Sequence, residues 1–161
     1  FFFVKFMSNL VLDTECGRIT LRLRPDAAPS TVQHMIKLVQ SKLYDGCCFY
    51  RSDFVIQCGL QRADGTSVKN PHPNLTVNET ASNTFLSNLR GTVATAHWDV
   101  PDCGNSEFFI NLKANPHLDS AYGGYCVWAE VVDAESFSTV DAISAAVLGG
   151  RKPGIKSATI V

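Results

Sequence analysis

Hydrophobic and polar residues alternate strictly over positions 18–24, with Ile19, Leu21 and Leu23 as the apolar members. A period of two places apolar side chains on one face of a β-strand and polar side chains on the other. Turn-forming residues join this strand to a short apolar run at 10–13, so the two segments predict a β-hairpin. We expect one face to contact a core and the other to contact water, as in an antiparallel sheet.

A different period follows, in which apolar residues recur three or four positions apart. They are Val32, Met35, Ile36, Val39 and Leu43. This spacing predicts an amphipathic helix that begins near Pro29, a residue favoured in a first helical turn, and that ends before Asp45 and Gly46. His34 lies off the apolar stripe, so we expect its side chain to face solvent.

A second helix is predicted near the end of the chain, where Ser136 is a candidate N-cap and Gly149 and Gly150 are closing residues. Its apolar positions are Phe137, Val140, Ile143 and Val147. Further strands are predicted at 48–56, with an interruption near residues 52–53, and at 91–96, 108–112 and 125–132. Many short strands with two helices indicate a mainly β domain, a closed barrel with helices over its ends.

Residues 61–83 are rich in Gly, Pro, Asn and Thr and form a long irregular segment, which in a compact domain is usually functional or mobile. The whole chain of 161 residues has the size of one ordinary domain, and we expect residues 1–161 to form a single monomeric domain. The apolar residues 1–6 are too few to span a bilayer. They could be a leader remnant, a cloning remnant or an extra strand.

We expect a cytoplasmic protein, with the nucleus as an alternative, or the secretory pathway if residues 1–6 are a signal remnant. The glycosylation sequons that begin at Asn74 and Asn78 would matter only in a secreted protein. Basic and acidic residues, 14 and 15 in number, are not clustered, which argues against a nucleic-acid partner. The six cysteines are adjacent or scattered and the four histidines are dispersed, so we expect free thiols and no metal site. We also expect no other cofactor and no membrane association.

Arg51 is the first candidate for chemistry, because it lies among aromatic and β-branched residues in the segment Phe49–Gln57. An arginine keeps its charge and offers five donors in a rigid fork, so placing it there is costly unless it has partners or acts on a ligand. On this segment alone, a side chain that extends to solvent is the simpler interpretation.

Two further segments change that interpretation. Gly104–Asn111 reads Gly-Asn-Ser-Glu-Phe-Phe-Ile-Asn, and Pro-His-Leu-Asp follows at 116–119. Together with the strand around Arg51, these motifs resemble the cyclophilin family of peptidyl-prolyl isomerases, from about Asn9 to the end of the chain. The resemblance implies an eight-stranded antiparallel β-barrel capped by two α-helices, with an active groove on its outer face. It also implies proline-containing peptides and unfolded or folded protein clients as partners.

By this resemblance, Arg51 is the catalytic arginine, Gln57 orients it, and Phe54 belongs to the same site. The implied substrate-binding residues are Val55, Ala96, His97, Glu107, Phe109, His117, Leu118 and Tyr125. Phe108 should point opposite to Phe109, into the core. The resemblance therefore implies an isomerase that needs no nucleophile, metal or redox cofactor.

Several positions depart from the family pattern. The segment from Arg51 to Phe54 is two residues shorter than is common, which could alter the geometry between arginine and pocket. Trp98 replaces a small residue, and Tyr125 replaces a frequent histidine. His117 replaces a frequent tryptophan, so we expect weakened binding of cyclosporin, a ligand of the family.

Glu107 stands where the family usually has glutamine, and we expect its carboxylate to lie within reach of Arg51. The carboxylate would then compete with substrate for the donors of the guanidinium. These substitutions leave open a peptide-binding module of the same fold with little or no turnover. A third hypothesis is a metal- or thiol-dependent enzyme that uses Cys47, Cys48 or Cys58 with His97.

Overall fold

The computed structural model describes residues 8–81, 86–98 and 104–161, so an extra strand within residues 1–6 lies outside the described part. The strands are β1 (Asn9–Thr14), β2 (Gly17–Leu23), β3 (Cys47–Ser52), β4 (Val55–Arg62), β5 (Thr92–Thr95), β6 (Phe108–Asn111), β7 (Val127–Val131) and β8 (Ile155–Ile160). The helices are α1 (Pro29–Gln40) and α2 (Ala134–Leu148), and the short 3-10 turns are η2 (Glu79–Ala81), η3 (Pro116–Asp119) and η4 (Ala121–Gly123).

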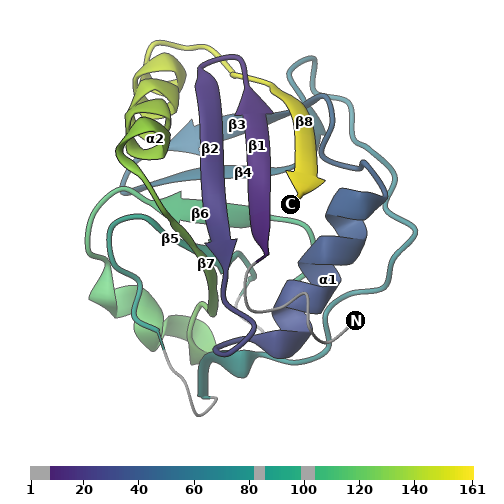
Figure 1. Ribbon diagram of the computed structural model, residues 1–161, viewed down its shortest axis with the longest axis vertical. Helices are drawn as coiled ribbons and strands as arrows, with labels where there is room; N and C mark the ends of the chain where they lie inside the picture. The colour runs from purple at the N-terminus through teal and green to yellow at the C-terminus, as the bar shows by residue number, and fades with distance from the viewer. Residues whose placement is uncertain (1–7, 82–85, 99–103) are drawn as a thin grey trace.

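All eight strands belong to one antiparallel sheet in the order β3-β4-β6-β5-β7-β2-β1-β8. The two end strands approach each other, because the backbone N–H of Phe49 donates to Pro153 O at 3.0 Å and that of Gly46 donates to Ile155 O at 2.7 Å. The sheet thus curls into a nearly closed barrel, with α2 and α1 at opposite ends (Figure 1). The predicted mainly β barrel with two helices is confirmed.

The first hairpin forms as its alternation predicts. Leu10 pairs with Leu21 and Leu12 pairs with Ile19. The apolar side chains of β2 are at most 2% exposed and pack into the barrel interior, whereas Arg22, between them, is exposed. The two-residue alternation of β2 therefore accounts for both the buried face and the solvent-exposed face of this part of the sheet.

Helix α1 buries more of its surface than its apolar stripe predicts. Leu38 is fully buried beside Met35 and Val39, and the helix ends at Gln40, before Leu43. The expectation that His34 faces solvent is wrong: its side chain is buried, with Nε2 2.9 Å from Asn105 Oδ1. The segment that carries Asn105 covers this face of α1, and burial lowers the pKa of His34.

Helix α2 begins about one turn earlier than expected. Asp133 is the N-cap, and its Oδ1 accepts a hydrogen bond from the backbone N–H of Ser136 at 2.9 Å. Ser136 is buried instead, and its Oγ accepts a bond from Thr20 N at 2.8 Å. The expectation that Ser136 caps the helix is therefore wrong, because this hydroxyl joins α2 to β2 across the barrel end.

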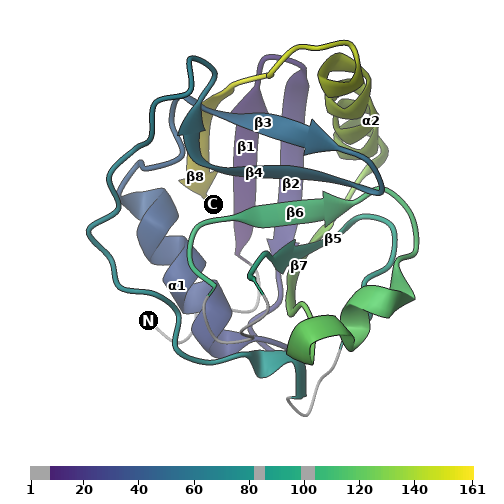
Figure 2. The same ribbon diagram turned by 180° about the vertical axis from the view of Figure 1, so that it is seen from behind.

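The segment 48–56, expected to be one interrupted strand, is a hairpin that reverses at Asp53 and Phe54. Asp53 closes this turn: its backbone N–H donates to Val55 O at 3.0 Å, and its Oδ1 accepts from Val55 N at 3.2 Å. An interruption of two residues is also the signature of a tight turn. The hairpin places β4 beside β6 and β3 on the other side of β4, on the side that faces the viewer in Figure 2.

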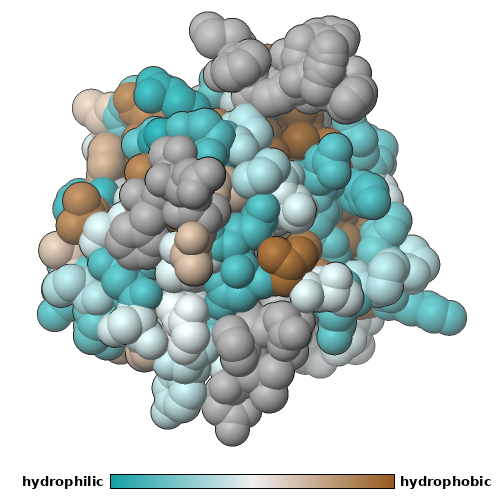
Figure 3. Space-filling model, turned by 90° about the horizontal axis from the view of Figure 1, so that it is seen from below, coloured by the Kyte–Doolittle hydropathy of each residue, from teal (hydrophilic) through white to brown (hydrophobic). Residues whose placement is uncertain are grey.

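Exposed large hydrophobic residues are dispersed over the described surface. They are Val77, Leu89, Trp98, Tyr122, Leu148 and Val161. Seen from below, hydrophobic residues lie singly among hydrophilic ones (Figure 3). In the described part of the chain, neither helix is long and apolar enough to cross a membrane.

Candidate active site

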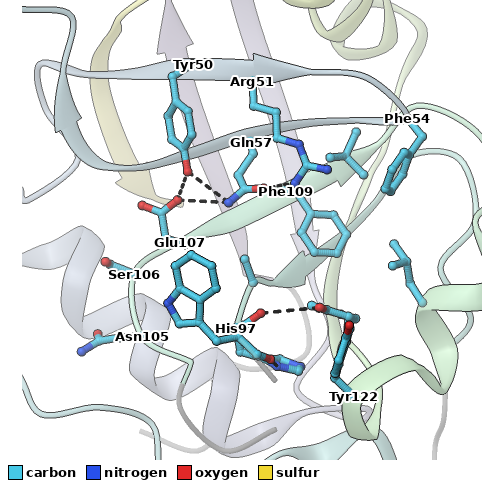
Figure 4. A pocket seen from close by; sticks show the side chains of 15 residues that line it. Tyr50, Arg51, Phe54, Gln57, His97, Asn105, Ser106, Glu107, Phe109 and Tyr122 are labelled. Carbon is cyan, nitrogen blue, oxygen red and sulfur yellow. Dashed lines mark hydrogen bonds between the residues drawn. The ribbon is translucent and has the colours of Figure 1, made fainter. Parts of the chain in front are cut away.

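A groove of about 980 Å³ opens beside the β3–β4 hairpin. Its walls come from that hairpin, from β6 and the segment before it, from the segment that follows β5 and from η3, η4 and the residues just after η4 (Figure 4). The lining residues are Tyr50, Arg51, Phe54, Val55, Gln57, Ala96, His97, Trp98, Asn105, Ser106, Glu107, Phe109, Leu118, Tyr122 and Tyr125. All of the sequence-predicted site residues except His117 are among them.

Arg51 is held at the groove by three neighbours. Its Nη1 donates to Gln57 Oε1 at 2.8 Å, and its Nε donates to Asp53 Oδ2 at 2.8 Å. The guanidinium carbon lies 5.4 Å from the centre of the Phe54 ring, within range of a cation–π contact. The side chain remains 41% exposed, so the charge stays accessible while its orientation is restrained.

The short turn between Arg51 and Phe54 does not move the arginine away from the groove. Asp53 both closes the turn and pairs with Arg51, and the next residue, Phe54, lines the groove. Phe54 also receives the edge of the His117 ring, with ring centres 5.5 Å apart. His117 itself is exposed and contributes to the groove only by flanking Phe54.

The floor of the groove is apolar. Val55, Phe109 and Leu118 are at most 8% exposed and belong to a small hydrophobic cluster separate from the barrel core. The Phe109 and Tyr125 rings meet edge to face, with centres 5.8 Å apart. Phe108 points the other way into the core, where its ring contacts Phe49, Tyr44 and Trp128, as expected.

His97 and Tyr125 form a stacked pair at one wall, with ring centres 4.2 Å apart. The two imidazole nitrogens of His97 lie 2.6 Å from Trp98 O and 2.9 Å from Gly124 O. This ring therefore joins the segment after β5 to the loop after η4. The backbone N–H of Ala96 donates to Glu107 O at 2.9 Å, so of the two backbone groups of Ala96, only its carbonyl can contact a ligand.

Glu107 does not pair with Arg51, and the expected ion pair is wrong. Its Oε1 accepts a short hydrogen bond from Tyr50 Oη and another from Gln57 Nε2 at 3.1 Å. Gln57 therefore lies between the carboxylate and the guanidinium, and Arg51 pairs with Asp53 instead. Competition between Glu107 and substrate for Arg51 loses its structural basis.

Tyr50 is a groove residue that sequence reasoning misses. Strict alternation along β3 would place it on the face opposite to Arg51. The register, however, pairs Phe49 with Cys58 and Arg51 with Gln57, so Tyr50 is the extra residue of a β-bulge. The bulge lets consecutive side chains reach the groove (Figure 4).

Tyr122 was also not anticipated. It lies in the loop Ala-Tyr-Gly-Gly at 121–124 with a left-handed backbone, φ 51°, and the residue is 62% exposed at the rim of the groove. Such a backbone is uncommon for a residue other than glycine. Its only sequence signal is an aromatic residue in a glycine-containing loop.

A buried polar network supports the back of the groove. Asn111 Nδ2 donates to Asn88 Oδ1 at 3.0 Å, and Asn115 Nδ2 donates to Asn111 Oδ1 at 2.9 Å. The network reaches two groove segments, because Asn115 also donates to Phe54 O and Asn88 donates to Tyr125 O. These hydrogen bonds hold the backbone of Phe54 and Tyr125 beside the groove.

Asp119 anchors this network, since its Oδ1 accepts from the backbone N–H of Asn88 at 2.8 Å and from Asn88 Nδ2 at 2.9 Å. Burial acts to raise the pKa of Asp119, but hydrogen bonds from Ser87 and Asn88 outweigh it, so the pKa lies below its ordinary 3.8. A depressed folded-state pKa adds stability above the ordinary value that is lost as pH falls through the folded value.

We therefore expect the free energy of unfolding to decline below about pH 4, and Asp119→Asn to reduce that decline. Urea unfolding from about pH 6 to about pH 3 measures both curves. The exposed Glu135 on α2 is the matched control position, since Glu135→Gln leaves this network intact. Parallel curves for Asp119→Asn and the unmodified protein would contradict the expectation.

Cys47, Cys48 and Cys58 do not form a reactive centre. These thiols are free and at most 1% exposed, and burial raises the pKa of Cys47 to about 11. All three thus stay protonated near neutral pH and lie outside the groove lining, which disfavours the thiol hypothesis. Cys103 lies outside the described residues. Among the described residues, no three His, Cys, Asp or Glu side chains are grouped as metal ligands would be.

Comparison with known proteins bears on this groove. A family model described as cyclophilin type peptidyl-prolyl cis-trans isomerase/CLD matches residues 9–161. A peptidyl-prolyl cis-trans isomerase of Streptomyces antibioticus is 35% identical over 153 residues, 91% of this chain and 89% of its own length. Peptidyl-prolyl cis-trans isomerase B of Escherichia coli is 33% identical over 149 residues, 84% of each chain.

A crystal structure of a cyclophilin type isomerase from Cryptosporidium parvum, in the presence of the dipeptide Ala-Pro, has the same fold. Its TM-score is 0.74 at 19% sequence identity, covering 95% of this chain and 98% of that chain. At this identity the structural likeness concerns the fold.

Proposed function

This chain belongs to the cyclophilin-type peptidyl-prolyl cis-trans isomerases, and from that premise we propose that its groove binds an X-Pro segment and that Arg51 promotes rotation about the X-Pro bond. The proline ring would occupy the apolar floor formed by Val55, Phe109 and Leu118. The presence of Ala-Pro with the Cryptosporidium parvum relative supports proline-containing peptides as ligands.

The reaction requires weakened amide resonance, because that resonance gives the X-Pro bond a barrier of about 18–20 kcal/mol. A donor directed at the prolyl nitrogen favours a pyramidal nitrogen whose lone pair no longer conjugates with the carbonyl. Such a donor stabilises the twisted transition state more than either planar ground state. Gln57 and Asp53 use two of the five N–H groups of Arg51, which leaves three that can face a ligand.

Arg51 cannot supply the whole acceleration. A hydrogen bond from a charged donor contributes about 1.5–3 kcal/mol, whereas a ~10⁵-fold acceleration needs about 7 kcal/mol. The remainder would come from holding the prolyl ring and its flanking backbone while the other side of the bond rotates. The apolar floor and the carbonyl of Ala96 are suited to that task.

The observation that carries this proposal is the oriented but accessible guanidinium of Arg51 beside the apolar floor formed by Val55, Phe109 and Leu118. NMR exchange spectroscopy on a short Ala-Pro peptide tests it directly. We expect faster cis–trans exchange at catalytic protein concentrations, together with chemical-shift changes in Val55, Phe109 and Leu118. Binding with no change in the exchange rate would instead identify a peptide-binding module.

We propose that cyclosporin binding is weakened by the exposed His117 beside Phe54, and that His117→Trp strengthens it. A tryptophan would restore a large apolar surface and an indole donor at this edge. Calorimetric titration of both proteins measures the difference, with His72→Trp as a control tryptophan outside the groove lining. Tight binding by the unmodified protein would contradict the proposal.

A further inference from the structure

Three side chains beside Arg51 form a closed ring of hydrogen bonds. Tyr50 Oη donates to Glu107 Oε1 and accepts from Gln57 Nε2 at 3.0 Å, while Gln57 Nε2 also donates to Glu107 Oε1 at 3.1 Å. On its other side, the amide oxygen of Gln57 accepts from Arg51 Nη1 at 2.8 Å. Figure 4 shows Gln57 between Glu107 and the guanidinium.

The chemistry of the ring permits only one orientation of the Gln57 amide. An ionised carboxylate only accepts hydrogen bonds, and a guanidinium only donates them. If the amide turned over, its oxygen would face the oxygen of Glu107 and its NH₂ group would face Arg51, and both interactions would be lost. A glutamine at position 107 could donate or accept and would not fix the orientation from this side.

This ring of hydrogen bonds is also partly shielded from water, which strengthens the bonds. Tyr50 and Gln57 are half-buried in the groove wall, and burial, followed by the bond to Glu107, raises the pKa of Tyr50. Tyr50 therefore remains a donor over the whole neutral range. Its hydroxyl occupies Glu107 Oε1, which keeps that carboxylate directed at Gln57.

Gly59 on β4 provides the space for this carboxylate. A Cβ atom at position 59 would lie 1.4 Å from Glu107 Oε2. The obstacle would be the end of a flexible side chain and not backbone, so an alanine at 59 should displace the carboxylate without unfolding the strand. The chain thus offers a way to move Glu107 without changing its charge.

We propose that Glu107 and Tyr50 are positioning residues, which lock the Gln57 amide and through it hold Arg51 in its reactive orientation. This inference rests on the proposed function of Arg51. It reverses the effect expected from direct competition, because removing the charge at 107 should now lower catalysis. No contact between Glu107 and substrate is required.

The test measures kcat and KM separately for a neutral X-Pro peptide with Glu107→Gln, Gly59→Ala and Tyr50→Phe. We expect each variant to lower kcat about threefold to tenfold, with KM changed less than twofold, because orientation matters most in the transition state. Glu135→Gln, which removes an exposed charge on α2, is the matched control and should keep the unmodified kcat.

A double-mutant cycle separates positioning from a merely structural role. In a Gln57→Ala background, Glu107→Gln should leave kcat unchanged, because the residue through which it acts is gone. An equal loss of kcat in both backgrounds, or a rise in kcat for Glu107→Gln alone, would overturn the proposal.

Side-chain ¹⁵N NMR gives a readout that does not depend on activity. Glu107→Gln should shift the Gln57 amide and Arg51 Nε signals, whereas Glu135→Gln should not. If the unmodified protein were inactive, the function proposed for Arg51 would fail. The chemical shifts would still test whether Glu107 positions the Gln57 amide. If neither Glu107→Gln nor Gly59→Ala shifted these signals, the proposed positioning of the Gln57 amide would be refuted even in an active enzyme.

Discussion

Arg51→Ala should lower kcat/KM by at least about tenfold, equivalent to about 1.36 kcal/mol of transition-state stabilisation. The guanidinium is the charged donor at the edge of the apolar floor, and its partners Gln57 and Asp53 cannot replace it. The free energy of unfolding should change little, because the side chain is 41% exposed and exposed ion pairs contribute little. NMR exchange on a short X-Pro peptide and urea unfolding measure the two effects.

Two further variants sharpen this expectation. Arg51→Lys keeps the charge but should also be damaging, because an ammonium cannot bond Gln57 through a planar fork and still address the prolyl nitrogen. Arg18→Ala removes another exposed arginine paired with an aspartate, on β2, and is the matched control. Wild-type turnover by Arg51→Ala would show that the mechanism is wrong.

Asn111→Ala should destabilise the protein by about 2–6 kcal/mol, since it orphans Asn88 Oδ1 and one N–H of Asn115, each buried group costing about 1–3 kcal/mol. Asn111 is completely buried at the end of β6. The loss should also raise KM, because the network holds the carbonyls of Phe54 and Tyr125. Urea unfolding and peptide kinetics measure the two effects.

Asn74→Ala is the control for this change, because Asn74 is exposed and its single bond is to Asn105. Its effect on the free energy of unfolding should stay within about 0.5 kcal/mol. If Asn111→Ala were equally mild, the buried network would not stabilise the groove, and the Phe54 and Tyr125 rings would owe their positions to packing alone.

The fold was predictable wherever one period dominates a segment. The alternation around Ile19 and Leu21 identified the first hairpin and its buried face correctly. Helix α1 was found from its apolar stripe, but His34 was misplaced, because helical periodicity describes one buried face and the segment of Asn105 covers a second. The N-cap of α2 was wrongly predicted at Ser136, because Asp133 and Ser136 are both cap-forming residues. Only the fold shows that the serine hydroxyl accepts a hydrogen bond from Thr20 instead.

The site was predictable as a set of lining residues and not as a set of bonds. Family resemblance places Arg51, Gln57 and Phe109 in the groove, where they lie. The bulge that turns Tyr50 into the groove has no signature in the alternation of β3, so its contact with Glu107 could not be anticipated. The partner of Glu107 depends on shifts of a few ångströms, which a sequence pattern does not encode.

The closure of the barrel by β8 has a consequence for how the chain folds. Strand β8 pairs with β1 and lies beside β3, so residues 155–160 complete ladders begun before residue 53. Pairings this distant in sequence are slow to form, because the loop-closure entropy is lost before the contacts repay it. Without β8, both β1 and β3 have open edges, and open edges invite aggregation. A chain truncated before residue 155 should therefore aggregate more than the full chain during refolding, which light scattering would reveal.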